Sequence, residues 1–276
     1  MKMVVFRLQN KECAADIRRL EKMLMKYGIK VSHARLAEIS ELPEEILAVT
    51  DSEEEAAFAK KKEIAVIFYE CVGDVSRVSG VDMVVQGFEE IDVKFLQLVY
   101  KRHHNLPWMI AETEHLYIRE SVEEDLEAFC SLYREKGITD YIPEPGFENE
   151  EGRARFCQYI KSMYPFYNYG IWTVIKKDSG EIIGRAGIEN GEYRGENILE
   201  LGYMIGKKWQ GRGFGIEAAQ ASAEFAREVL GVHRLYAFIY PQNAASIGVI
   251  VKIGFERRPG LTEDGLSVWR KTWRKI

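Results

Sequence analysis

ELGYMIGKKWQGRGFGIEAAQASAEFA, residues 200–226, decides the fold of the second half of this chain. An apolar strand pattern runs into a glycine-rich loop at 210–215, and an alanine-rich helix pattern begins at once. Glycines permit tight turns and let successive backbone N–H groups approach a ligand, while the N-terminus of a helix adds unpaired donors and a partial positive charge. This geometry suits a pyrophosphate group.

The spacing of the glycines excludes two other phosphate-binding loops. The stretch contains no GxxxxGK[ST], so it is not a P-loop, and GRGFGI at 211–216 lacks the third glycine of the dinucleotide fingerprint GxGxxG. The loop also comes late in its half of the chain, whereas a Rossmann turn follows the first strand.

Motifs around this loop resemble those of one enzyme superfamily. QGRGFG at 210–215 matches the Q/R-x-x-G-x-G/A coenzyme A loop of the GNAT N-acetyltransferases, and 243–246 and 252–255 are similar to that superfamily's N-x-x-S and K-x-G-F. TEHLYIRES, 113–121, is similar to the opening of the ribosomal-protein alanine N-acetyltransferase branch. The resemblance covers about residues 110–276.

The resemblance implies a mixed, strongly twisted sheet with flanking helices, splayed beside the strand at 202–205, with the pantetheine arm of acetyl-CoA in the gap. No metal is implied. The residues that it assigns to the cofactor are Gln210, Gly211, Arg212, Gly213, Phe214 and Gly215, whose backbone amides would hold the pyrophosphate, together with Met204, Ile205 and Asn243. A surface role for Arg212 and a helix-capping role for Asn243 remain alternatives.

The resemblance also implies catalytic residues. Glu200 occupies the position of a glutamate that removes the amine proton, and a solvent-facing strand glutamate is the alternative. The backbone N–H groups of Met204 and Ile205 would bind the acetyl carbonyl. Ser246, or a water in its place, would protonate the sulfur, because the tyrosine that many members use is replaced here by Ile250.

The acceptor wall is expected in the aromatic stretch MYPFYNYGIW at 163–172, where Tyr164, Tyr167 and Trp172 are candidate contacts. An aromatic cluster of this kind is also typical of a core. The acceptor itself stays open between a peptide or protein α-amine and a small-molecule amine.

The first hundred residues alternate strand and helix patterns, which predicts parallel pairing in a small Rossmann-like α/β domain. Pro107 marks a junction, so we expect domains at 1–108 and 109–276. The first domain weakly resembles a degenerate haloacid dehalogenase-like hydrolase. The positions of the two catalytic aspartates hold Arg7 and Gln9, which can neither attack a phosphate nor hold magnesium as two carboxylates do, and Asp51 alone is insufficient.

The expected elements of the chain follow from its apolar patterns and turn residues. In the first domain strands are predicted at 4–8, 45–51, 64–70 and 82–87, and helices at 13–27, 52–62 and 93–104. In the second domain strands are predicted at 115–121, 171–177, 181–189, 198–206, 234–240 and 266–273, and helices at 122–136, 152–167, 214–230 and after Pro241.

Composition narrows the class of protein. The 276 residues are 46% apolar and 29% charged, with a formal net charge of −5, which argues against a sequence-wide attraction to nucleic acid or to an anionic membrane. Cys13, Cys71, Cys130 and Cys157 lie far apart, as expected of reduced thiols. Neither a signal peptide nor a membrane span is recognisable, so a cytoplasmic location is expected.

Three hypotheses follow. The leading one is an acetyl-CoA-dependent N-acetyltransferase whose first domain is non-catalytic and regulates, binds a ligand or forms a homodimer. The second is a bifunctional phosphatase and acetyltransferase, which Arg7 and Gln9 disfavour. The third is a non-catalytic acyl-CoA sensor, for which Ile250 is the hint.

Overall fold

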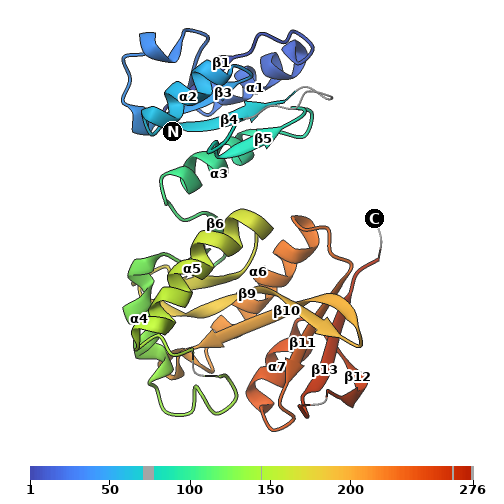
Figure 1. Cartoon of the computed structure of the whole chain (residues 1–276). Coiled ribbons are helices and arrows are strands. Elements are labelled where there is room, and N and C mark those ends of the chain that lie inside the picture. Colours follow the sequence, from blue (N-terminus) through green and yellow to red (C-terminus); the bar gives the residue numbers. More distant parts are fainter. Residues whose placement is uncertain (71–77, 144, 263, 275–276) are drawn as a thin grey trace. The chain divides into compact units, whose positions relative to one another are not determined.

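The computed structural model describes residues 1–70, 78–143, 145–262 and 264–274. Contacts between Cα atoms divide the chain into two compact units, Met1–Trp108 and Met109–Ile276. Each unit contains its own sheet, of five strands in the first and eight in the second (Figure 1).

The first unit is built on a parallel sheet with the strand order β2-β1-β3-β4-β5. Its strands are β1 (Met3–Arg7), β2 (Lys30–Ser32), β3 (Ile46–Thr50), β4 (Ala65–Tyr69) and β5 (Met83–Val85). Its helices are α1 (Ala14–Lys26), α2 (Glu53–Lys61) and α3 (Val93–His103), with short 3-10 turns η1 (Leu36–Glu38) and η2 (Pro43–Glu45). The predicted parallel α/β architecture is confirmed.

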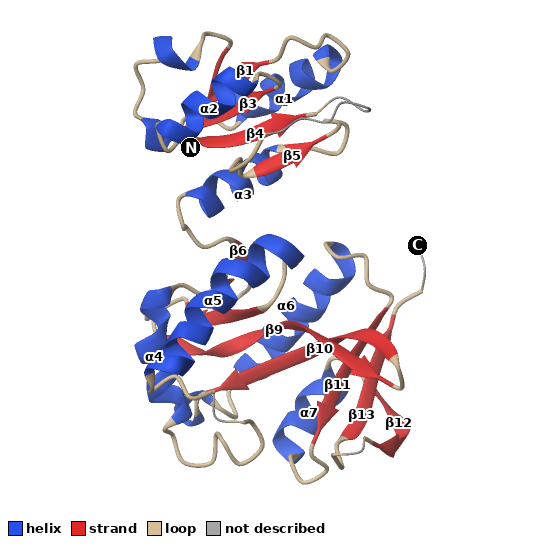
Figure 2. Ribbon diagram, in the orientation of Figure 1, coloured by secondary structure: helices blue, strands red, loops and turns tan. Residues whose placement is uncertain are grey.

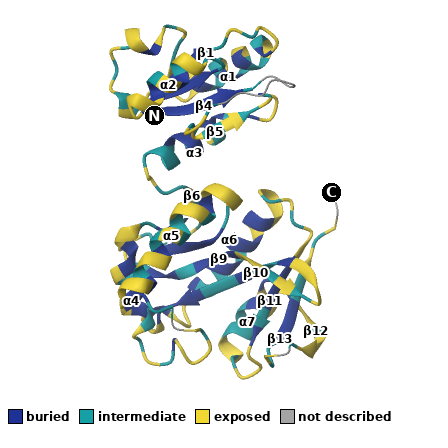
Figure 3. Cartoon of the chain, viewed as in Figure 1, coloured by how far each residue is buried: buried dark blue, intermediate teal, exposed yellow. Residues whose placement is uncertain are grey.

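The sequence explains why this sheet is parallel and central. Strands β3 and β4 read ILAVT and AVIFY and are buried at every position, as expected where helices cover both faces. One core cluster packs around Leu20 and Leu96 from α1 and α3, and the other around Ala56 and Ala59 from α2. The central strands are therefore dark blue in Figure 3.

At the carboxyl ends of β1 and β3, polar side chains bind backbone groups of neighbouring loops. The Asp51 carboxylate accepts hydrogen bonds from the backbone N–H groups of Gln9 (2.8 and 2.9 Å) and Asn10 (2.8 Å). Arg7 donates to the His33 carbonyl oxygen (3.1 Å). These contacts give Asp51 and Arg7 roles in fixing backbone, and the hydrolase resemblance stays a prediction.

The second unit is a mixed sheet with the order β12-β13-β11-β10-β9-β8-β7-β6 (Figure 2). Its strands are β6 (Met109–Glu112), β7 (Leu116–Arg119), β8 (Ile171–Lys176), β9 (Ile182–Tyr193), β10 (Glu196–Ile205), β11 (Arg234–Ile239), β12 (Glu256–Leu261) and β13 (Ser267–Thr272). Its helices are α4 (Leu126–Tyr133), α5 (Glu150–Tyr167), α6 (Phe214–Glu228) and α7 (Ala244–Lys252), with 3-10 turns η3 (Glu123–Asp125) and η4 (Lys207–Trp209). This architecture confirms the fold class expected from the sequence.

One expected helix differs from the structure, and three strands, β2, β6 and β12, were not predicted. The helix predicted at 122–136 is shortened to α4, because Asp125 turns inward and binds Arg119 through both carboxylate oxygens (2.6 and 2.7 Å). Strand β12 was not predicted, since ERRPGL has neither apolar alternation nor β-branched residues. Strand β6 was missed as well, in the segment interpreted as a junction.

The state of the cysteines and the character of the helices bear on the expectations from composition. Cys13, Cys130 and Cys157 are free, and Cys71 lies outside the described residues. No helix in the described part of the chain combines the length and apolar character needed to cross a membrane.

Candidate active site

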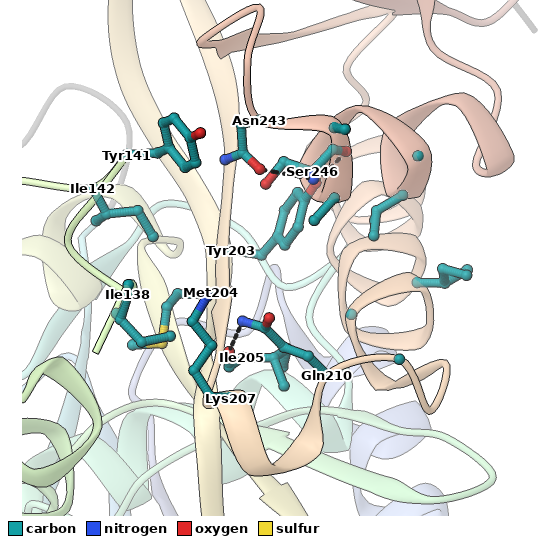
Figure 4. A pocket seen from close by; sticks show the side chains of 18 of the residues that line it. Ile138, Tyr141, Ile142, Tyr203, Met204, Ile205, Lys207, Gln210, Asn243 and Ser246 are labelled. Carbon is teal, nitrogen blue, oxygen red and sulfur yellow. Dashed lines mark hydrogen bonds between the residues drawn. The ribbon is translucent and has the colours of Figure 1, made fainter. Parts of the chain in front are cut away.

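A gap in the sheet forms the site. Strand β10 pairs with β9 from Glu196 to Ile205, but it pairs with the parallel strand β11 only where Glu200 lies opposite Tyr236. Beyond Glu200 the two strands diverge, as the resemblance implied. A cavity of about 540 Å³ lies there, lined by the carboxyl end of β10, the glycine-rich loop, the first turns of α6 and α7, and residues 137–142 (Figure 4).

The glycine-rich loop presents unoccupied donors at the start of α6. Gly211 and Gly213 adopt φ values of 75° and 91°, a left-handed conformation that glycine tolerates best. Among the described residues, the N–H groups of the five residues from Gly211 to Gly215 have no protein acceptor. Free amides at a helix N-terminus form an anion-binding cradle, so the loop fits a pyrophosphate.

Gln210 differs from its five neighbours. Its backbone N–H donates to the Lys207 carbonyl oxygen (3.2 Å), which ends η4. Its side-chain Nε2 donates to the Ile205 carbonyl oxygen (2.8 Å) and fastens the loop to β10 (Figure 4). The Gln210 N–H is thus already engaged here and its side chain fastens the loop, while the role of Gln210 toward phosphate stays a prediction.

Two further predicted cofactor residues do not line the cavity with their side chains. The Arg212 guanidinium lies 5.2 Å from the centre of the Trp209 ring. Phe214 is buried, with its ring 6.2 Å from that of Trp209. Toward this cavity, Phe214 offers its backbone amide, while Arg212 is exposed and its contact with a phosphate stays a prediction.

Some backbone N–H groups of β10 face the gap and others face β9. The Ile205 carbonyl points away from β9 toward Gln210, while the Gly206 N–H donates to Ile183 of β9 (2.9 Å). Because N–H groups alternate between the two edges of a strand, those of Tyr203 and Ile205 face the gap and that of Met204 faces β9. Met204 lines the cavity, but the prediction that its N–H binds the acetyl carbonyl is corrected to Tyr203 and Ile205.

Helix α7 brings Asn243 and Ser246 to the opposite wall. Asn243 caps the helix, because its Oδ1 accepts a hydrogen bond from the Ser246 N–H (3.1 Å). The Tyr203 hydroxyl donates to the Ser246 carbonyl oxygen (2.8 Å), which joins β10 to α7 across the gap (Figure 4). Ile250 is fully buried. Asn243 and Ser246 both line the cavity.

Glu200 lies deeper, where β10 and β11 separate. Burial and the neighbouring carboxylate of Glu189, its partner across β9, raise the pKa of Glu200 to about 7, although a hydrogen bond from the Phe238 backbone lowers it in part. Burial also raises the pKa of Glu189. A carboxylate with such a pKa is half protonated near neutrality and exchanges protons readily there.

A second cavity, of about 360 Å³, connects Glu200 to the first. Tyr203, Met204, Asn243 and Ser246 line both cavities. The structure therefore brings together Glu200, Ser246 and the gap-facing edge of β10, and separates them from the phosphate cradle by the length of the first cavity.

Comparisons with known proteins agree with this geometry. The family model described as Acetyltransferase (GNAT) domain matches residues 115–256. The chain belongs to the GNAT acetyltransferase family.

Its relatives include characterised and uncharacterised acetyltransferases. The Bacillus subtilis protein called uncharacterized N-acetyltransferase YnaD is 32% identical over 161 residues, which are 58% of this chain and 90% of that protein. The [ribosomal protein uS5]-alanine N-acetyltransferase of Escherichia coli is 35% identical over 96 residues, 34% of this chain and 49% of that enzyme. An acetyltransferase from Agrobacterium tumefaciens aligns with a TM-score of 0.51 at 25% identity, covering 59% of this chain and 94% of that one.

This GNAT domain is thus an acetyl-CoA-dependent acetyltransferase. A solved structure of RimL in complex with coenzyme A shares the fold, with a TM-score of 0.50 at 16% identity over 60% of this chain and 98% of that one. At this identity the likeness shows the fold alone.

The aromatic residues predicted as acceptor contacts, Tyr164, Tyr167 and Trp172, line neither of the two cavities. Tyr164 is buried, accepts a hydrogen bond from the Ser121 N–H (3.1 Å) and donates to the Ile171 carbonyl oxygen (2.6 Å). Trp172 is fully buried, with its ring 4.9 Å from that of Phe225. Tyr164 and Trp172 are core residues in this structure, whereas Tyr167 is exposed and lines neither cavity, so its contact with the acceptor stays a prediction.

Two residues of the GNAT site were missed by sequence reasoning. Tyr203 and Glu189 belong to no motif, and their importance depends on which neighbours the fold gives them. A weak signal existed for Tyr203, which lies between Glu200 and the expected acetyl-binding backbone. No signal paired Glu189 with Glu200, because the register of β9 on β10 sets that contact.

Proposed function

We propose that the protein transfers the acetyl group of acetyl-CoA to a primary amine, of a protein N-terminus or of a small molecule, by direct attack in a ternary complex. The observation that best supports this proposal is the pair of connected cavities, because Ser246 and Tyr203 line both and Glu200 lines the second. A base and a proton donor thus reach one shared space.

The chain's own residues divide the work. The free amides from Gly211 to Gly215 would hold the pyrophosphate, and Gln210 would keep their loop against β10. When bound, acetyl-CoA supplies the thioester carbonyl. The gap-facing N–H groups of Tyr203 and Ile205 would stabilise the oxyanion that develops there, an effect of about 3 kcal/mol for each such donor.

Proton transfers complete the reaction. Glu200 takes the proton that the amine loses, directly or through water, as the new nitrogen–carbon bond forms and the carbon–sulfur bond breaks. Ser246 gives its hydroxyl proton to the leaving thiolate and takes a proton back from water, while Glu200 releases the amine proton to solvent, so the free thiol leaves and both residues are restored. A Glu200 pKa of about 7 matches an α-amine, whose ordinary pKa is about 7.7–8.0, better than a lysine amine at about 10.4.

The relatives favour the same acceptor class. The name of the Escherichia coli relative describes acetylation of alanine in ribosomal protein uS5. We therefore place peptide and protein α-amines first among the acceptors to be tested.

The test is thiol release from acetyl-CoA with a panel of peptide N-termini, polyamines and aminoglycosides, each product being verified by mass spectrometry. We expect at least one α-amine acceptor to be acetylated, and a reaction without acceptor to release no thiol above background. Tight binding of acetyl-CoA without transfer to any member of the panel would instead support a non-catalytic sensor.

A further inference from the structure

Four arginines line a separate cavity of about 390 Å³ in the second unit. Its lining residues come from the β9–β10 hairpin and from β11, β12 and β13. The arginines are Arg194, Arg234, Arg258 and Arg270, and the other lining residues are Tyr193, Glu196, Tyr236 and Pro259.

The fold holds these side chains in place. Arg194 lies at the tip of the hairpin with φ 55°, followed by Gly195 with φ 77°, the positive pair typical of a tight hairpin turn. Arg258 lies at the irregular register between β12 and β13, and Arg270 lies within β13. Beneath them Tyr193 and Tyr236 pack with ring centres 5.8 Å apart.

The arginines make no close ion pair among the described residues, although Glu256 of β12 lies opposite Arg270 of β13. Within the described residues, none of the four guanidinium groups has a carboxylate oxygen within 4.0 Å, and Glu196 is the one acidic residue of the lining. Arg258 and Arg270 are half-buried, yet the chain as a whole carries a net charge of −5. Guanidinium groups bind carboxylates and phosphates through paired hydrogen bonds, so this cavity suits an anion.

The cavity is aligned with the candidate base. Glu200 pairs with Tyr236 of β11, and Tyr236 pairs with Arg270 of β13, so the three residues form one row on one face of the sheet. Two strand spacings place the backbones of Glu200 and Arg270 about 10 Å apart. A further cavity, of about 610 Å³, is lined by Glu200 and by Arg194, and Arg194 also lines the arginine cavity.

Charge changes sign along this row. Glu200 lies opposite Glu189 on β9, and Glu192 and Asp264 also line the cavity of about 610 Å³. The negative charge at this end of the row suits a cationic amine. Beyond Tyr236 the row carries Arg270 and then Glu256, its cross-strand partner on β12, and the other three arginines line the same cavity as Arg270. An acceptor with an amine at one end and an anionic group at the other would match both.

We propose that the arginine cavity binds a carboxylate or phosphate carried by the amine acceptor, about 10 Å from its reacting nitrogen. This inference rests on the proposed function and names its substrate class. An extended peptide rises about 3.4 Å per residue, so the anionic side chain belongs to about the third or fourth residue of a peptide acceptor.

Matched peptides test the inference. The probes are Ala-Gly-Glu-Glu-Gly amide, its phosphoserine counterpart with Ser phosphate at both Glu positions, and Ala-Gly-Gln-Gln-Gly amide. Acetylation is followed by thiol release, and equilibrium binding by fluorescence anisotropy of C-terminally labelled peptides. We expect kcat/KM for an acidic peptide to exceed that for the Gln peptide by about tenfold to a hundredfold, through KM, because two charge-assisted contacts are gained.

Two pairs of variants locate the effect. Arg258→Gln with Arg270→Gln should remove the preference and leave the Gln peptide unaffected. The second double variant, Arg194→Gln with Arg234→Gln, changes exposed residues and should weaken the preference for acidic peptides. It keeps the test decisive if the first double variant folds poorly. Arg257→Gln, whose side chain does not line this cavity, is the matched control and should keep the preference.

The outcomes separate the two proposals. Equal kcat/KM and equal binding for all three peptides, unaffected by either pair of variants, would overturn the inference and leave acetyl transfer standing. Arginine-dependent binding of an acidic peptide without any acetylation would support the inference and contradict the proposed function. The comparison of the Glu and phosphoserine peptides identifies the anion.

Discussion

Glu200 is the residue on which the proposed chemistry depends most. Its carboxylate is largely buried, faces Glu189 across β9 and has its pKa raised to about 7. A base must be ionised to accept a proton, so Glu200 works above this pKa and is protonated and inactive below it. The raised pKa therefore predicts an activity that increases as the pH passes through about 7.

Replacing Glu200 by Gln tests this role. Glu200→Gln should lower kcat by about a hundredfold near neutrality, since general bases contribute about 10² to 10⁴. The deficit should shrink as pH rises, because the free amine then needs less help. A kcat–pH profile of the variant is the measurement, with Glu224→Gln on the exposed surface of α6 as control, and an unchanged profile would remove Glu200 from the mechanism.

Ser246 and Tyr203 carry two hydroxyl groups into the same space. Burial raises the pKa of Tyr203, and its hydroxyl is held by the Ser246 carbonyl oxygen. We expect Ser246→Ala to lower kcat by about a hundredfold and Tyr203→Phe by less, because Tyr203 fastens α7 rather than the sulfur. Single-turnover rates would check this order, and a larger loss in Tyr203→Phe would assign the proton to the tyrosine.

The sequence predicted some residues of this site and not others. The motif positions Glu200, Asn243 and Ser246 do line the connected cavities, since a short motif fixes its own local geometry. Tyr164 and Trp172 were assigned to the acceptor wall and lie in the core, because aromatic residues are equally suited to both and only tertiary packing decides.

At the scale of elements, the divergence of β10 from β11 and the start of α6 create the cofactor cavity. One pair, Glu200 with Tyr236, joins the two strands, so the rest of that edge of β10 is free to bind a ligand. The sequence predicted strong elements such as β10 and α6 well. It missed β12, whose ERRPGL carries no apolar period and is held by its pairing with β13.

Gly213 is the point at which the loop becomes α6. A valine there would have to adopt φ 91°, at a cost of roughly 1–2 kcal/mol, and would place its branched side chain beside the free amides. We expect Gly213→Val to abolish detectable coenzyme A binding in calorimetry while the protein remains folded. Gly231→Val, at a positive φ outside the loop, is the matched control for strain, and equal affinity in both would contradict the loop assignment.

For the whole molecule, the two units are separable by their contacts, and the cavities described above belong to residues of the second. A fragment of residues 109–276 should therefore fold, because a domain has its own core. Its affinity for coenzyme A should stay within about threefold of that of the full chain. Calorimetry on both proteins is the check. A fragment that folds but no longer binds would show that the first unit contributes to the site.

The central claim is acetyl transfer between two ligands bound together in the gap of the second unit's sheet. The most direct test measures, on one reaction, the thiol released, the mass of the acceptor and the mass of the enzyme. The account predicts one thiol for each acetylated amine, only when both acetyl-CoA and acceptor are present, with no acetylated enzyme. Thiol release with an acetylated enzyme before any acceptor is added, or coenzyme A binding with no transfer at all, would contradict it.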